Sequence, residues 1–281
     1  MEVFKKISAL KRCLSLAKQK NIQIGFVPTM GALHQGHISL VDISKKQNGL
    51  TVVSIFVNPT QFGNPEDLKK YPKTLEKDIE LLENSGCDIV FIPTVDEIYS
   101  KNIASKNFVF GGIEHEMEGE FRNGHFNGVA TVIQSFFEIV SPTKAYFGEK
   151  DFQQLQIIKK LVEIESIPVA VIGCPIFREK DSLAMSSRNM RLDKTQRNSA
   201  PFIYQTLQQA KSLIPSKSLK EISLFVETAF KNHPVFNLEY FTIADEDSLR
   251  SSETLLPKKK YRAFIAVFAG EIRLIDNISI S

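Results

Sequence analysis

The sequence predicts an α/β protein with a parallel sheet in residues 1–175 and a smaller α+β domain in residues 176–281. From residue 22 to residue 173, short apolar runs alternate with segments of helical periodicity, which is the pattern of βαβ units. Helices between such strands make crossover connections, so the sheet should be parallel and covered on both faces. Beyond Pro175 this alternation stops, and we expect a second domain there.

The elements of the first domain follow from short apolar or β-branched runs and from helical spacing. Apolar side chains from Phe4 to Ala17 recur with helical spacing and predict an amphipathic helix at the N-terminus. The predicted strands are residues 22–28, 51–59, 87–93, 144–148 and 169–173. The predicted helices are residues 36–47, 74–86, 128–140 and 151–165. This order predicts a Rossmann-like sheet.

The second domain is predicted from a different order of elements. A polar loop over residues 177–192 precedes two helical segments, at about 195–214 and 219–231. The predicted strands are residues 239–244, 261–269 and 271–280, and the last two are close enough in sequence to form a hairpin. Because no Gly/Ser-rich linker separates the domains, we expect them to dock.

Composition and charge exclude several classes of protein. With 43% hydrophobic and 24% charged residues in 281, the chain has the composition of a folded globular protein. A net charge of +3 is too small to indicate nucleic-acid or membrane binding by charge alone. Cys13, Cys87 and Cys174 lack CxxC spacing and are expected to be buried thiols. Without a signal peptide or a long apolar segment, we expect a cytoplasmic protein.

Three polar motifs follow predicted strands of the first domain. These are "PTMGALHQGH" (28–37), "NPTQF" (58–62) and "GEKD" (148–151). In open parallel sheets, ligands bind beyond the carboxyl ends of the strands, at the point where the strand order reverses. We therefore expect the three motifs to share one edge of the sheet.

The first motif contains His34 and His37, three residues apart. If a helix begins near Gly36, both imidazoles lie at its first turn, where unpaired N–H groups and the helix dipole attract anions. Gly31 and Gly36 would let the backbone approach such a ligand closely. A metal site, which needs a third ligand, and a purely structural pair remain alternatives.

Neither GxxxxGK[ST] nor GxGxxG occurs in the chain, so groups other than the amides of a glycine-rich loop would have to bind phosphate. The candidates are Lys150 and Asp151 of "GEKD" and Ser186, Ser187 and Arg188 of "MSSRN". Each would otherwise be a solvated surface residue, which is the commoner environment of a single charged side chain.

The second motif and a glycine-flanked loop add further polar candidates. The amides of Asn58 and Gln61 can hydrogen-bond a hydroxyl or carboxylate of a small ligand, although Asn-Pro by itself indicates only a turn. The segment around Glu118, Arg122 and His125 is either a mobile cover or a plain connection.

Six motifs in order resemble the pantothenate synthetase (pantoate–β-alanine ligase) family of HxGH nucleotidyltransferases. They are "PTMGALHQGH", "SIFVNPTQF", "YPKTLEKD", "GHFNGVATV", "FGEKDFQQL" and "LAMSSRN", spread over roughly residues 20–192. The resemblance implies ATP-dependent condensation of pantoate with β-alanine through a pantoyl-adenylate, with release of AMP and pyrophosphate. It also implies Mg²⁺ and a homodimer. The C-terminal third carries little of the resemblance.

The resemblance also assigns roles to residues. His34, His37, Lys150 and Arg188 would be the catalytic residues that contact the ATP phosphates, and the pantoate side would involve Gln61, Gln154, Asn58, Glu118 and Arg122. The full ATP-binding set would be Met30, His34, His37, Gly148, Lys150, Asp151, Met185, Ser186, Ser187 and Arg188. Asp78 is the candidate metal ligand, although the preceding Lys77 is not acidic.

Two positions depart from the family pattern, and two other functions stay open. Ser182 stands where the family usually has glycine, and Asn123 where it usually has proline. A nucleotidyltransferase acting on another substrate is the second enzyme hypothesis, because HxGH alone does not fix the substrate. A non-catalytic RNA-binding protein is the third, and the even charge balance argues against it.

Overall fold

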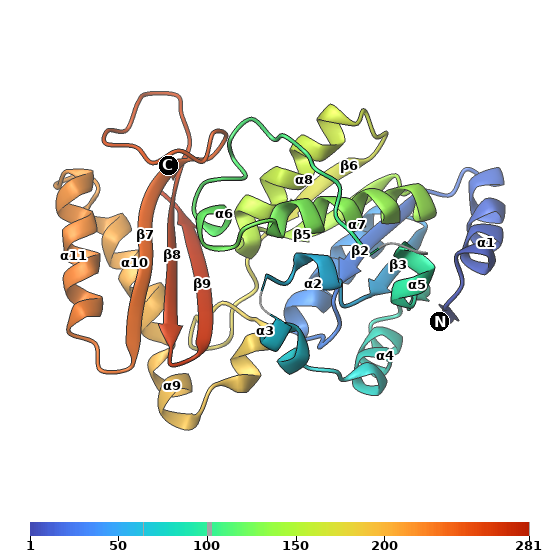
Figure 1. Ribbon diagram of the computed structural model, residues 1–281, viewed down its shortest axis with the longest axis horizontal. Coiled ribbons are helices and arrows are strands. Elements are labelled where there is room, and N and C mark those ends of the chain that lie inside the picture. The colour runs from blue at the N-terminus through green and yellow to red at the C-terminus, as the bar shows by residue number, and fades with distance from the viewer. Residues whose placement is uncertain (64, 100–102, 281) are drawn as a thin grey trace. The chain divides into compact units, whose positions relative to one another are not determined.

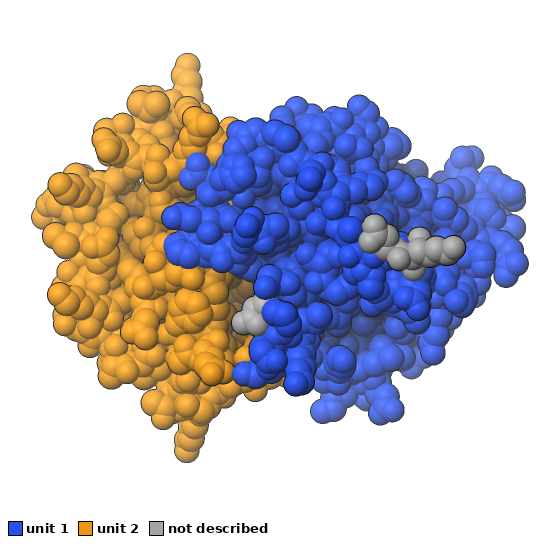
Figure 2. Space-filling model, viewed as in Figure 1, with its two compact units in different colours: residues 1–149, 154–175 blue, residues 150–153, 176–281 orange. Residues whose placement is uncertain are grey.

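The computed structural model describes residues 1–63, 65–99 and 103–280 and divides into two compact units (Figures 1 and 2). The first unit comprises residues 1–149 and 154–175, and the second comprises residues 150–153 and 176–281. The sequence did not indicate that residues 150–153 group with the second unit.

A parallel sheet forms the centre of the first unit. Its strands lie in the order β1-β4-β3-β2-β5-β6, and every described pairing is parallel. Their bounds are β1 Glu2–Phe4, β2 Ile24–Thr29, β3 Leu50–Ile55, β4 Ile89–Phe91, β5 Lys144–Gly148 and β6 Ala170–Cys174. From β2 the chain moves outward through β3 and β4, and β5 then returns to the other side of β2. The strand order therefore reverses between β2 and β5.

Helices cover both faces of this sheet (Figure 1). They are α1 Ile7–Gln19, α2 Gln35–Gln47, α3 Pro65–Lys70, α4 Leu75–Asn84, α5 Val95–Tyr99, α6 Glu118–Phe121, α7 His125–Val140 and α8 Phe152–Ile164, with short 3-10 helices η1 Pro59–Gln61 and η2 Glu149–Asp151. Successive residues of β2 face opposite layers, as the pleat requires. Phe26 meets the rings of Phe136 and Phe137 on α7, while Val27 belongs to a core cluster with Val41 of α2.

The second unit is a three-stranded antiparallel sheet with helices packed against it. Its elements are η3 Ser187–Arg191, α9 Lys194–Ser199, α10 Pro201–Leu213, α11 Leu219–Lys231, β7 Phe236–Asp245, β8 Tyr261–Ala269 and β9 Ile272–Ser279. Strands β8 and β9 form the predicted hairpin, which turns at Gly270 with a φ of 60°. Val226 and Phe230 of α11 share a buried core with Ile265 and Val267 of β8.

Three predictions about local structure were wrong. Phe4 lies in the edge strand β1, where it pairs with Phe91 of β4. An apolar side chain is compatible with this strand as well as with the helical spacing that suggested a helix. The single helix predicted near 195–214 is two helices, since Pro201 lacks an N–H and starts a new one. Cys13 is only partly buried, whereas Cys87 and Cys174 are buried.

The cysteines are poor nucleophiles in this fold. Burial raises the pKa of the Cys87 thiol to about 12 and that of Cys174 to about 11. A thiol is reactive only as the thiolate, so neither side chain is suited to covalent catalysis near neutral pH.

Candidate active site

The three polar motifs follow neighbouring strands of the first unit, as predicted. Strand β2 pairs with β3 on one side and with β5 on the other, all in parallel. The segments after these strands begin at residues 30, 56 and 149, at one edge of the sheet, where its strand order reverses. This is where a ligand binds in open parallel sheets.

The loop between β2 and α2 is held by a buried carboxylate. Gly31 and Ala32 have positive φ values of 79° and 51°, so the backbone turns sharply after β2. Asp78, on α4 and 2% exposed, accepts the backbone N–H of Ala32 at 2.9 Å and that of Leu33 at 2.8 Å. Its Oδ1 also accepts the Thr74 hydroxyl at 3.0 Å. These contacts favour a positioning role for Asp78 over the metal-ligand role expected from the sequence.

Glycine is required at position 31 for two reasons. A Cβ there would lie 3.0 Å from Asp78 Oδ2 and 3.1 Å from Ile55 Cγ2, and the positive φ disfavours other residues. The tight turn and the Asp78 contacts together set the start of α2.

His34 and His37 lie together at the N-terminus of α2. His34 is the N-cap residue, and the two ring centroids are 4.0 Å apart. The backbone N–H of His34 donates to His37 Nδ1 over 3.3 Å. An accepting Nδ1 carries no proton, so in the neutral ring the proton resides on Nε2. His37 can therefore present an N–H donor beside the positive end of the helix dipole.

Gln61 is oriented by a chain of buried polar contacts. Asn58 donates from Nδ2 to Gln61 Oε1 at 3.0 Å and to Gly128 O at 3.1 Å. Tyr99 donates its hydroxyl to Asn58 Oδ1 at 2.5 Å, which fixes the amide orientation of Asn58. With its oxygen engaged, Gln61 turns Nε2 toward the Met30 sulfur, 3.0 Å away. Because a thioether is a weak acceptor, a ligand oxygen can replace it at small cost.

The glycine-flanked loop lies beside this amide chain. Glu118 and Arg122 face each other across one turn of α6, with carboxylate and guanidinium 3.8 Å apart. His125, the first residue of α7, hydrogen-bonds through Nδ1 to the Gln61 carbonyl at 2.8 Å. A Cβ on Gly128 would lie 2.4 Å from the Thr60 carbonyl, so glycine allows α7 to approach η1. The loop therefore supports the Gln61 backbone.

The segment after β5 is divided between the units. Gly148 ends β5, and a Cβ added there would meet no atom of the described structure within 4 Å. Gln154, partly buried, lies in the first turn of α8 and belongs to the first unit. Lys150 and Asp151 belong to the second unit, where Lys150 Nζ lies 3.7 Å from Asp151 Oδ1.

The loop that carries "MSSRN" lies in the second unit and is held by local hydrogen bonds. Ser186 is the N-cap of η3 and accepts the Arg188 backbone N–H at 3.3 Å, and Met185 N–H donates to Phe177 O at 3.0 Å. Arg188 is partly buried and Ser187 is buried. The predicted ATP-contacting residues are thus divided: Met30, the histidines and Gly148 lie in the first unit and the remainder in the second.

Arginine and aspartate pairs hold this loop in place. Arg197 bridges Glu179 and Asp181, and its hydrogen bond lowers the pKa of Asp181. Arg178 donates to Ser182 O at 3.1 Å. Ser182 itself has a φ of 74°, the left-handed conformation for which glycine is better suited.

The sequence missed several residues of this region. Tyr99 lies in no quoted motif and acts through Asn58, 41 residues earlier, whereas Thr74 lies in "YPKTLEKD" but nothing in that motif indicated its contact with Asp78. Across the described residues, no three or more His, Cys, Asp or Glu side chains gather closely enough to bind a metal ion. No helix in the described part of the chain combines the length and apolar character needed to cross a bilayer.

Comparison with known proteins identifies similar chains of the same length. A family model described as "Pantoate-beta-alanine ligase" matches residues 2–279. The chain is 53% identical to the pantothenate synthetase of Christiangramia forsetii, over 100% of both sequences. The crystal structure of pantothenate synthetase from Thermus thermophilus has a TM-score of 0.92 at 38% identity and covers 100% of this chain and 99% of that one.

A third similar protein was crystallised with ligands. The structure of pantoate-beta-alanine ligase from Francisella tularensis, complexed with beta-gamma ATP and beta-alanine, is 36% identical with a TM-score of 0.82. It covers 100% of this chain and 98% of that one.

Proposed function

This chain belongs to the pantoate–β-alanine ligase family, and we propose how the described residues divide its reaction, the ATP-dependent condensation of pantoate with β-alanine. In the first step, the pantoate carboxylate attacks the α-phosphorus of ATP, which yields pantoyl-adenylate and releases pyrophosphate. In the second, the amine of β-alanine attacks the acyl carbon, AMP leaves, and the amine loses a proton. The observation that carries this proposal is the histidine pair at the N-terminus of α2, where the strand order reverses.

The first step needs charge stabilisation more than proton transfer. A carboxylate with a pKa of about 4 is already ionised near neutral pH, so no general base is required. Negative charge builds on the departing pyrophosphate, and preorganised donors stabilise it. His37 Nε2, His34 and the α2 N-terminus supply such donors from the first unit. Lys150 and Arg188, in the roles that the family resemblance implies, would supply cations.

The remaining ATP contacts surround these groups. Met30 and Gly148 would present backbone, since each directly follows or ends a strand at the reversal point. Asp151, Met185, Ser186 and Ser187 complete the predicted set in the second unit.

Pantoate would bind beside Gln61. The contacts of Asn58 and Tyr99 leave Gln61 with an N–H donor pointing at the weak Met30 acceptor, and this donor suits a carboxylate or hydroxyl oxygen. Gln154 would contribute a second amide. We assign Asn58 to orienting Gln61, because its own polar atoms contact Gln61, Gly128, Thr60 and Tyr99. Glu118 and Arg122 would support the covering loop.

Mg²⁺ would enter as part of the MgATP substrate. A magnesium ion at such sites is held largely by phosphate oxygens and water with one or two carboxylates. Asp78, the sequence candidate, already accepts three protein hydrogen bonds, so the described residues do not fit a site built from protein ligands alone. A homodimer stays a prediction from the family resemblance, and a cytoplasmic location stays a prediction from the sequence.

Pyrophosphate exchange tests the proposal directly. Incorporation of labelled pyrophosphate into ATP should require pantoate and should not require β-alanine. We expect His37→Asn, which keeps an acceptor near Nδ1 and loses the Nε2–H, to lower the exchange rate about 100-fold or more. His115→Ala is the control, because the His115 side chain is 81% exposed and outside the site. Exchange without pantoate, or undiminished exchange in His37→Asn, would overturn the proposal.

A further inference from the structure

Strand β9 holds the lysine of "GEKD" through one buried amide. We infer that Asn277 is a positioning residue for Lys150: its side chain binds the Lys150 main chain and fixes the lysine to the C-terminal sheet. This inference rests on the phosphate-contacting role proposed for Lys150. The two residues are 127 positions apart, and no motif links them.

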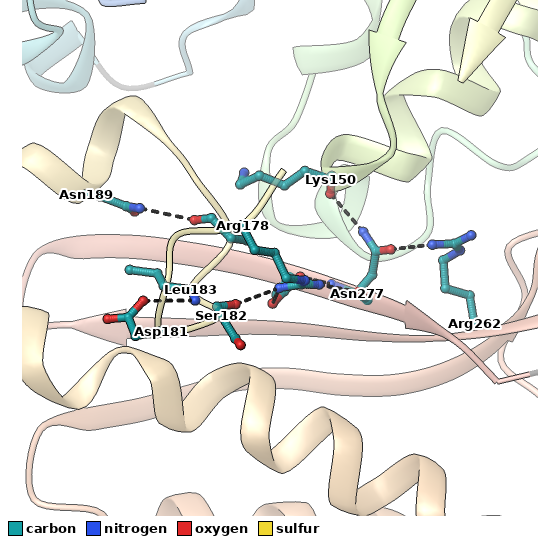
Figure 3. A network of polar contacts seen from close by, with 10 residues as sticks. Lys150, Arg178, Asp181, Ser182, Leu183, Asn189, Arg262 and Asn277 are labelled. Atoms are coloured by element: carbon teal, nitrogen blue, oxygen red, sulfur yellow. Dashed lines mark hydrogen bonds and ion pairs between the residues drawn. The ribbon is translucent and has the colours of Figure 1, made fainter. Parts of the chain in front are cut away.

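The orientation of the Asn277 amide is determined by both of its ends (Figure 3). Its Nδ2 donates to the Lys150 carbonyl at 2.9 Å, and its Oδ1 accepts from Arg262 Nη1 at 2.7 Å. A flipped amide would put oxygen against the carbonyl and NH₂ against a guanidinium, which are two repulsive contacts. Asn277 is 2% exposed, so water cannot easily replace either partner.

Arg262 is itself held on two sides. Its Nε donates to Glu246 Oε1 at 2.9 Å, and its guanidinium carbon lies 4.1 Å from the centre of the Phe152 ring. Phe152 belongs to the same four-residue segment as Lys150. The segment is therefore attached to the second unit by a main-chain hydrogen bond and by a stacked ring.

The residue before Asn277 supports the other cation-bearing loop. Asp276 accepts a bidentate pair of hydrogen bonds from Arg178, at 2.7 and 3.0 Å. Arg178 also donates to Ser182 O in the loop that leads to Arg188 (Figure 3). Two adjacent positions of β9 thus support the two segments that carry the cations. That arrangement connects Lys150 and the loop before "MSSRN" to the same strand.

A purely structural role for Asn277 predicts a different outcome from a positioning role. If Asn277 acts only on stability, its loss should change activity equally whether or not the lysine is present. If it acts through Lys150, its effect should disappear once the lysine side chain is gone. A double-mutant cycle separates the two.

The cycle uses Asn277→Asp, Lys150→Gln and the double variant in pantoate-dependent pyrophosphate exchange. Aspartate keeps the acceptor for Arg262 and loses the donor to the lysine carbonyl. We expect Asn277→Asp to lower kcat about tenfold or more, with the KM for pantoate nearly unchanged, and to lower it less than about twofold in the Lys150→Gln background. An equal loss in both backgrounds, or full activity of Asn277→Asp, overturns the inference.

Two further variants keep the result interpretable. Val226→Ala opens a cavity in the core of the second unit, outside this polar network, and should lower Tm while leaving kcat within about twofold of the parent. Asn277→Ala removes the donor together with the acceptor for Arg262, adds no charge, and replaces Asn277→Asp if the latter does not fold. If Lys150→Gln alone keeps full exchange activity, the proposed role of Lys150 fails. If Lys150→Gln loses activity and both Asn277 variants keep theirs, only the positioning inference fails.

Discussion

Replacing Asp78 by asparagine distinguishes a carboxylate that holds the β2–α2 loop from one that binds metal. Asp78 accepts two backbone N–H groups and one hydroxyl. Asparagine has one oxygen, so one backbone N–H would face an NH₂ group and the other bond would lose its charge assistance. Hydrogen bonds to charged groups contribute about 1.5–3 kcal/mol each, which gives a loss of about 2–4 kcal/mol in the free energy of unfolding. That is a large part of a typical stability, yet it leaves most domains folded.

The assay combines urea denaturation with a magnesium titration of pyrophosphate exchange. If Asp78 positions the loop, the variant should lose stability and kcat, because His34 and His37 follow the loop, while the Mg²⁺ concentration for half-maximal activity stays unchanged. Thr74→Val is the graded control, since it removes only the hydroxyl contact and should cost about 1 kcal/mol. If Asp78→Asn keeps the stability of the parent protein but needs more Mg²⁺ for half-maximal activity, the reasoning is refuted and the metal-ligand hypothesis is restored.

Three other substitutions test separate parts of the structure. Tyr99→Phe removes the hydroxyl that orients Asn58 and should raise the KM for pantoate about 2–10-fold in steady-state kinetics; an unchanged KM would contradict the orienting role. Burial lowers the pKa of His233 below 6.5, and its Nδ1 accepts two backbone N–H groups. Its contribution to stability is therefore complete above pH 6.5 and is lost as the pH falls through the lower folded-state pKa. His233→Asn, which keeps an acceptor and does not titrate, should reduce this loss in denaturation series between about pH 7 and 5, and an identical pH dependence would exclude His233 as its source. Ser182→Gly should raise the free energy of unfolding by about 0.5–1 kcal/mol, because relief of a positive φ exceeds the added chain entropy; a lower Tm would show that the serine is not strained.

Local patterns predicted every strand except β1, most of the longer helices, and the edge of the sheet from which the three motifs begin. The parallel order, the hairpin at Gly270 and the helix that starts beside His34 follow from apolar spacing and turn residues, which act over a few positions. Contacts between distant segments were not predictable in this way. Asp78 reaches a loop 45 to 46 residues earlier, and Asn277 reaches a carbonyl 127 residues earlier. Nothing in the spacing of either residue indicates its partner.

The sequence did not indicate the contacts of the segment that carries Lys150. Its motif follows a strand of the parallel sheet, so the strand pattern suggested that it belongs there. In the structure, the contacts of Phe152 and Asn277 group it with the antiparallel sheet. Membership in a unit depends on which side chains surround a segment, and chain order alone does not reveal them.

The attachment of residues 150–153 to β8 and β9 constrains how this family can recombine. A chimera made by joining two relatives at residue 175 would combine the lysine segment of one parent with the Asn277 and Arg262 positions of the other. Unless both parents share these residues, the lysine segment of the hybrid would lack the Asn277 hydrogen bond and the Arg262 contact with Phe152. When the C-terminal part is exchanged between diverged relatives, hybrids should therefore be active more often if the donor also supplies residues 150–153. This short segment and the last two strands have to come from the same parent.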